Sequence, residues 1–172
     1  MNMRGQYFSF DAIIATVIMV LAFSSLVAYW YGAQAVVESR TYSRLDDANR
    51  IAESLLSPGA PSNWNNLSYT YQIRQIGIAT SFGNELDMDK VDALAANANL
   101  GNYAEVGNLL RAGGNYFILI ERTNTNASMG ENEIIAEIGS HPIPANASNV
   151  AVANRGATLN GRPVRMRVFL WK

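Results

Sequence analysis

Few residues in this 172-residue sequence have a type and spacing that could do chemistry. Asp87, Asp89 and Asp92 are close enough together to suggest a calcium site, but they lack the ligand spacing and closing glutamate of an EF-hand loop. Aspartate also accepts hydrogen bonds from the free amides at a helix start, so we expect Asp87 or Asp89 to be an N-cap. The single histidine, His141, lies in a proline-containing loop and is expected at the surface rather than on a metal.

Other reactive groups are missing from the sequence. There is no cysteine, which excludes disulfides, thiolate metal sites and cysteine nucleophiles. No glycine-rich phosphate loop, two-histidine helix or paired carboxylate set stands out. The formal net charge of −1 offers no basic surface for nucleic acid. We therefore expect no catalytic residue, no cofactor, no metal site and no nucleic-acid partner.

Three asparagines, Asn66, Asn126 and Asn146, each stand two places before a serine. This is the acceptor pattern for asparagine-linked glycosylation, which is found on external domains. The three residues are therefore possible glycosylation sites. The chain is rich in asparagine, serine and threonine, so such triplets also arise by chance and do not by themselves place the C-terminal part outside the cell.

Asp11 is a further carboxylate, and it stands at the start of an apolar run. From Ala12 to Ala33 there is no formal charge, and at about 1.5 Å rise per residue this run makes roughly 33 Å of helix. A hydrocarbon core is about 30 Å thick, so the run predicts a membrane-spanning helix. A removable signal peptide has a shorter apolar core, which is followed by a cleavage site of small residues. Here the apolar run is longer and the aromatic cluster Tyr29–Tyr31 stands near its end, so a removable signal peptide is disfavoured. Basic residues flank the run on both sides, so they do not determine its orientation.

The helical pattern continues beyond the apolar run. Apolar residues recur at three-and-four spacing, which is typical of an amphipathic helix. They are Val37, Leu45, Ala48, Ile51, Ala52 and Leu55. Pro58 and Gly59 end the pattern. We predict one helix from Tyr7 to Leu56, although an anchor followed by a separate first helix of the domain fits the pattern too.

After this helix the pattern predicts a small α+β domain. Alternating residues favour a strand at 67–73, and two short helices are expected near 89–97 and 103–112, the second ended by Gly113-Gly114. Further strands are expected at 115–122 and 134–139. Near the end, two alternating runs flank Asn160-Gly161, the strongest short signal of a β-hairpin. The apolar stripe of the long helix is expected to lie across this small antiparallel sheet.

The N-terminal residues of the chain, together with the long helix that follows them, resemble an archaeal type IV pilin-like protein with a class III signal peptide. Met1–Gly5 resembles its short basic leader, and Gln6 resembles its first mature residue. In that family a membrane peptidase cuts after the glycine and leaves the helix attached to its domain. The family most often has its acidic residue five places into the mature chain, whereas Asp11 falls one place later.

The resemblance extends over most of the chain. Ser57–Trp64 resembles the turn that follows the long helix in minor-pilin-like proteins, and residues 87–94 and 103–110 resemble the next helical pair. It implies a leader at 1–5, a spine helix at 6–56 and an external α+β head at 57–172. It also implies a filament subunit, a minor one in particular, whose partners are copies or other pilins, a prepilin peptidase, and an assembly platform with its ATPase. Its place would be the cell membrane and an extracellular filament, with adhesion as one use.

On this interpretation Asp11 has an assembly role. A carboxylate in hydrocarbon costs several kcal/mol unless it is paired, and the freed amino terminus of a neighbouring helix could neutralise it. Alternatively, Asp11 lies at the lipid headgroups and interacts with the dipole of its own helix. The rival function is a single-span membrane protein with an external binding or sensor domain that does not polymerise.

Overall fold

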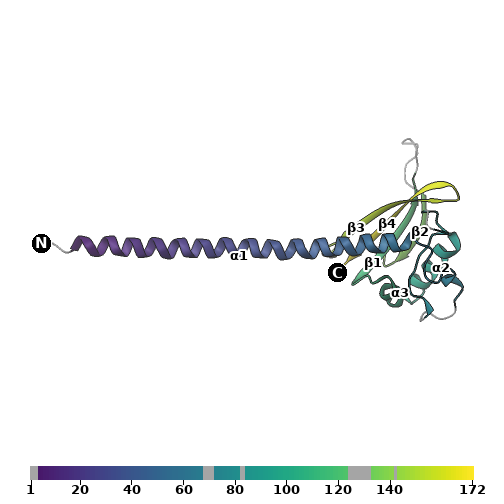
Figure 1. Ribbon diagram of the computed structural model, residues 1–172, viewed down its shortest axis with the longest axis horizontal. Coiled ribbons are helices and arrows are strands. Elements are labelled where there is room, and N and C mark those ends of the chain that lie inside the picture. The colour runs from purple at the N-terminus through teal and green to yellow at the C-terminus, as the bar shows by residue number, and fades with distance from the viewer. Residues whose placement is uncertain (1–3, 68–71, 82–83, 124–132, 142) are drawn as a thin grey trace. The chain divides into compact units, whose positions relative to one another are not determined.

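The computed structural model describes residues 4–67, 72–81, 84–123, 133–141 and 143–172, and it describes side chains from Phe10 onward, except at 40 and 41. The chain forms an α+β arrangement of one long helix, short helices and a four-stranded sheet (Figure 1). The elements are α1 (Arg4–Leu55), the 3₁₀ helix η1 (Trp64–Asn66), α2 (Met88–Asn99), α3 (Tyr103–Leu110), β1 (Asn115–Arg122), β2 (Glu133–Gly139), β3 (Ala151–Leu159) and β4 (Arg162–Trp171). Two compact units result, Met1–Arg40 and Thr41–Lys172, and α1 contributes to both.

The sheet of the second unit has the strand order β2-β1-β4-β3, and every neighbouring pair is antiparallel. The predicted hairpin is confirmed: β3 and β4 are joined through Asn160 and Gly161, with φ of 51° and 72°. Positive φ at both central residues is the turn geometry that matches the twist of two antiparallel strands. The predicted strand at 115–122 is also confirmed, and it is an inner strand because it pairs with β2 and β4.

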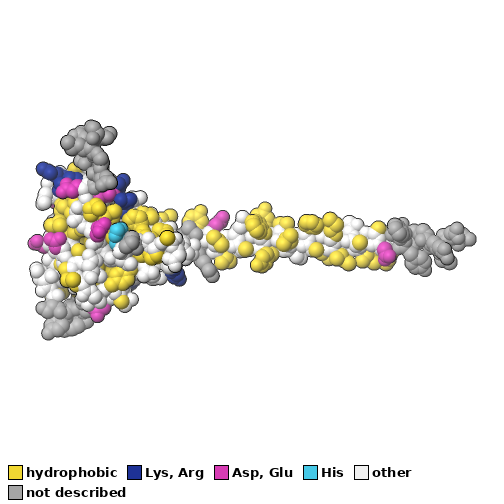
Figure 2. All heavy atoms as spheres, turned by 180° about the vertical axis from the view of Figure 1, so that it is seen from behind, with side chains coloured by type: hydrophobic (Ala, Val, Ile, Leu, Met, Phe, Trp, Pro, Cys, Tyr) yellow, Lys and Arg dark blue, Asp and Glu magenta, His cyan; other side chains and the backbone are white. Residues whose placement is uncertain are grey.

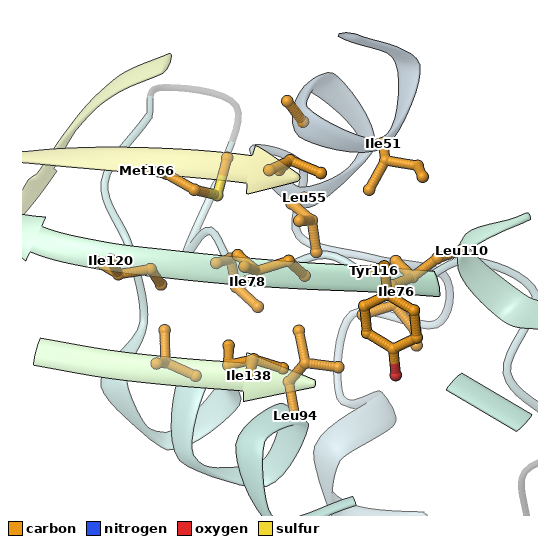
Figure 3. Packing of buried hydrophobic residues seen from close by; sticks show 14 of the residues in the cluster. Ile51, Leu55, Ile76, Ile78, Leu94, Leu110, Tyr116, Ile120, Ile138 and Met166 are labelled. Atoms are coloured by element: carbon orange, nitrogen blue, oxygen red, sulfur yellow. The ribbon is translucent and has the colours of Figure 1, made fainter. Parts of the chain in front are cut away.

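The core of the second unit lies between one face of this sheet and the helices (Figure 3). Alternate residues of β4 point into it: Val164, Met166, Val168 and Leu170, each at most 2% exposed. The last turns of α1 cover this face, because Ala48, Ile51, Ala52 and Leu55 are fully buried. The amphipathic stripe is thus confirmed over 48–55, whereas Leu45 is 38% exposed and Val37 belongs to the other unit.

The predicted strand at 67–73 is wrong where the structure describes it. Leu67, Gln72 and Ile73 lie outside any strand, and residues 68–71 lie outside the described residues. The chain instead enters the core slightly later, at residues 76–79, which are all buried. Its backbone bonds with the end of α1, since the Ile78 amide donates to the Leu55 carbonyl at 2.8 Å. A period-two pattern makes a strand only where another strand is available to pair with it.

The two short helices lie where they were expected, with one corrected boundary. Asp87 is the N-cap of α2, and its carboxylate accepts a hydrogen bond from the Asp89 amide at 3.1 Å. However, α3 ends at Leu110 rather than at the glycine pair, because Arg111 adopts a left-handed conformation with φ of 55°. The guanidinium of Arg50 on α1 donates to the Leu110 and Arg111 carbonyls at 3.2 and 2.8 Å, which stabilises this earlier end.

Candidate functional site

The first unit presents an apolar helix surface that no described residue covers. Consecutive residues from Val17 to Leu21 are each more than half exposed, and at 100° per residue they point to every side of the helix. The same holds along the helix, where large apolar side chains from Phe10 to Val37 are 42–75% exposed (Figure 2). By length and composition, the helical stretch Phe10–Leu55 is able to cross a membrane. Burial of so much apolar surface requires lipid or other helices.

Two hydroxyl side chains on this surface are satisfied within the helix. The Thr16 hydroxyl donates to the Ala12 carbonyl and the Ser25 hydroxyl to the Leu21 carbonyl, both at 2.8 Å. Such bonds to the preceding turn remove the need for water around a hydroxyl. These two residues therefore do not oppose transfer of the helix into hydrocarbon.

Asp11 is exposed, and its carboxylate has no hydrogen bond or ion pair with a described residue. Gly5 and Gln6, the residues expected to flank a cleavage site, belong to the first turns of α1, and their surroundings are not described. The expected pairing of Asp11 with a neighbour's amino terminus involves a second chain and stays a prediction.

The second half of α1 is joined to the rest of its unit by arginines. The Arg155 guanidinium on β3 lies 3.1 Å from both the Asn49 amide oxygen and a Glu53 carboxylate oxygen on α1. Two arginines of α1 donate to carbonyls elsewhere in the unit. Arg44 donates to the Asn149 carbonyl at 3.3 Å, and Arg50 donates to the Leu110 carbonyl at the end of α3. No local pattern in the sequence indicated these links, because their partners lie 60 to 106 residues apart.

Lys90 is another residue that was not expected to join elements of the head. It is only 5% exposed, and its ammonium donates to the carbonyls of Pro58 and Ala79, both at 3.0 Å. It thereby joins α2 to the turn after α1 and to the buried segment at 76–79. One signal was present in the sequence: Lys90 is the only basic residue of α2, and it stands beside the buried Val91.

The opposite face of the sheet carries a buried carboxylate. Glu121 on β1 is 4% exposed and is held by two arginines of β4, Arg165 at 2.6 Å and Arg167 at 3.1 Å. The register of the sheet explains this contact, because Glu121 is directly opposite Arg165. The arrangement pairs a charge that would otherwise be costly to bury. It also supplies no free acid for chemistry.

Tyr103 of α3 and Tyr116 of β1 form a reciprocal pair. The rings of Tyr103 and Tyr116 are stacked with centroids 4.4 Å apart, and each hydroxyl bonds to the other residue's backbone. Burial raises the pKa of the Tyr103 hydroxyl. Burial, and then the proximity of Tyr103, raises the pKa of Tyr116 further. Both hydroxyls are therefore neutral structural donors at physiological pH.

The remaining predicted residues are scattered over the head. Asn66 lies in η1 and Asn146 in a turn, both exposed, while Asn126 lies outside the described residues. The exposed His141 ring lies against the Phe117 ring, with a centroid distance of 4.8 Å and the two planes tilted by 32°. Within the part of the chain that the structure describes, no three His, Cys, Asp or Glu residues form a group that could hold a metal ion.

Comparison with known proteins adds no further guide. No family model, curated protein or solved structure matches this chain.

Proposed function

We propose that this chain is a structural subunit of a type IV pilus-like surface filament, inserted in the membrane by its N-terminal helix. The observation that carries the proposal is the contrast within α1. Its apolar side chains are exposed on every side from Phe10 to Val37, yet those from Ala48 to Leu55 are buried in the head. The exposed apolar side chains suit contact with lipid before assembly and with neighbouring helices after it. The buried apolar side chains hold the head on the helix.

The proposal gives the head, which begins in the second half of α1, an external position. It assigns the chain no reaction and no cofactor. The partners are copies of this chain or related subunits that pack along the helix, together with the peptidase, platform and ATPase that process and assemble such subunits. A minor subunit and an adhesive use remain parts of this proposal that rest on the resemblance.

Asp11 is the residue whose chemistry discriminates between assembly and simple anchoring. Cleavage after Gly5 would create an amino terminus close to Asp11 in sequence, and this ammonium on one helix could neutralise Asp11 on the next. A carboxylate so paired loses much of its cost in an apolar bundle. An uncleaved chain has no such amine within reach of Asp11. The rival function, an anchored binding or sensor protein, corresponds to this uncleaved chain.

The mass of the intact chain recovered from the membranes of its native cells tests the proposal first. A chain that begins at Gln6 supports processing and assembly. A chain that still begins at Met1 would overturn the filament proposal and favour the anchored binding protein.

Charge variants then test the role of Asp11 itself. Asp11→Asn should reduce the yield of sedimentable filaments at least tenfold, while Asp11→Glu should retain most of it. Asp46→Asn is a matched control, since Asp46 is also on α1 and exposed but belongs to the head. Equal filament yield from Asp11→Asn and Asp46→Asn would refute the pairing.

A further inference from the structure

The uncharged stretch of α1 is longer than one membrane requires. Charged side chains bound it at Asp11 and Glu38, and the 26 residues between them make about 39 Å of helix. A hydrocarbon core is about 30 Å thick, and only a tilt of about 40° would keep the whole stretch inside it, twice the average tilt of membrane helices. Two positions of the helix are therefore open: the hydrocarbon begins beside Asp11, or it ends beside Glu38.

An aromatic cluster lies where the first of these positions would end. Tyr29, Trp30 and Tyr31 follow Asp11 by 18–20 residues, which corresponds to about 27–30 Å of helix. The three side chains are 64–75% exposed. Their hydroxyl and indole N–H groups bond to no residue that the structure describes. Tyrosine and tryptophan favour a membrane interface, because the ring is apolar and its polar group reaches headgroups or water.

The spread of the three rings around the helix indicates what covers them. Successive residues of a helix are turned by about 100°, so the cluster extends over about 200° of the helix surface. A single neighbouring helix contacts one side only, whereas a membrane interface surrounds the helix at one depth. Lipid headgroups are thus the partner that can contact all three rings of one chain.

Gln34 supports the same position of the helix. Its side chain is exposed and forms no hydrogen bond within the described part of the chain. If the hydrocarbon ended beside Glu38, this amide and the polar groups of the aromatic cluster would lie in lipid without partners, which is unfavourable. If the hydrocarbon ends at the aromatic cluster, all of these groups reach water.

We propose that the membrane boundary on the side of the head crosses α1 at the aromatic cluster Tyr29–Tyr31, and that the opposite boundary lies beside Asp11. Before assembly, the helix from Gly32 to Glu38 then lies outside the hydrocarbon. The proposal rests on the membrane insertion contained in the proposed function and not on filament assembly. It therefore applies equally to the rival anchored protein.

Single-cysteine labelling of the full chain in liposomes of dioleoylphosphatidylcholine is the experiment. The sequence contains no cysteine, so each introduced thiol is unique. Labelling by a membrane-impermeant maleimide is expressed relative to Ser62→Cys, an exposed position in the head. Ala33→Cys and Ala35→Cys should reach at least half of that labelling. Ala22→Cys, about halfway between the proposed boundaries, should be labelled at least tenfold less until detergent dissolves the liposomes.

Replacement of the aromatic cluster tests whether it sets the depth of the helix. The combined variant carries Tyr29→Leu, Trp30→Leu and Tyr31→Leu. It should reduce the labelling of Ala33→Cys at least threefold, because an uninterrupted apolar helix can then enter the hydrocarbon as far as Glu38 allows. Phe23→Leu is the matched control, since it removes an aromatic ring from within the span and should leave the labelling unchanged.

The outcomes separate this proposal from the proposed function. If Ala33→Cys and Ala35→Cys are as protected as Ala22→Cys, the hydrocarbon extends towards Glu38, and the proposed boundary is overturned while membrane insertion stands. If Ala22→Cys is labelled as readily as Ser62→Cys, the helix is not in the bilayer, and the proposed function fails as well. Equal labelling in the cluster variant and the Phe23→Leu control would refute the role of the aromatic cluster in setting the depth.

Discussion

Replacement of Lys90 by methionine should destabilise the head, because this lysine is a buried cation held only by backbone carbonyls. Its ammonium donates to the carbonyl of Pro58, in the turn after α1, and to that of Ala79, in the buried segment at 76–79. Methionine keeps most of the apolar stem, so the substitution removes the ammonium with little change in packing. What is lost is the link between the turn after α1, the buried segment at 76–79 and α2.

The magnitude follows from the two hydrogen bonds. A hydrogen bond to a charged group contributes about 1.5–3 kcal/mol, and both are lost together. The ammonium itself is costly to bury, and its removal offsets part of this loss. The Ala79 carbonyl is left without a partner inside a fully buried residue. We expect the free energy of unfolding to fall by about 2–4 kcal/mol.

Urea unfolding of the full chain in detergent measures this change. A Trp30→Phe background confines the tryptophan signal to Trp64 and Trp171, which are both 2% exposed. Lys172→Met is the matched control, since it removes the other lysine of the chain, an exposed one. If Lys90→Met and Lys172→Met unfold at the same urea concentration, the two carbonyl bonds do not hold the head together and the reasoning fails.

Two further predictions concern close packing and pH. Gly77→Ala should lower the free energy of unfolding by about 3 kcal/mol, because its Cβ would lie 2.1 Å from the Ser57 carbonyl oxygen. Gly156→Ala, whose Cβ meets nothing within 4 Å, should change it by less than about 1 kcal/mol; equal urea midpoints for the two variants would contradict the packing. The raised pKa of Tyr116 favours its neutral form in the folded head. Below about pH 10 unfolded tyrosine is also neutral, so the stability of the head is full there. Above about pH 10 the unfolded tyrosine loses its proton first, so the free energy of unfolding falls as the pH rises. Unfolding midpoints from pH 8 to 12 should show this fall, and Tyr116→Phe should make it shallower; an unchanged slope would show that other groups cause it.

Local patterns predicted much of the architecture. The apolar run after Asp11 and the hairpin at Asn160-Gly161 were both identified, because helix length and turn type depend on residues next to one another. The alternating run after Gly161 was also identified, and it forms β4, because side chains along a strand alternate whatever the strand packs against. Asp87 was among the two residues proposed as N-cap of α2, because capping is a contact over two or three residues.

The sequence alone thus determined that a membrane-length helix precedes a small α+β head, because hydrophobic period and turn chemistry are encoded within short windows. Only the tertiary structure decided where that helix enters the core, at Ala48, and that residues 76–79 join the core without forming a strand. It also decided that α3 ends at Leu110, where the Arg50 guanidinium donates to the carbonyls of Leu110 and Arg111. The physical reason is the same in each case: these features depend on contacts between residues far apart in the chain, and no local pattern specifies which distant group will fill a space or accept a hydrogen bond.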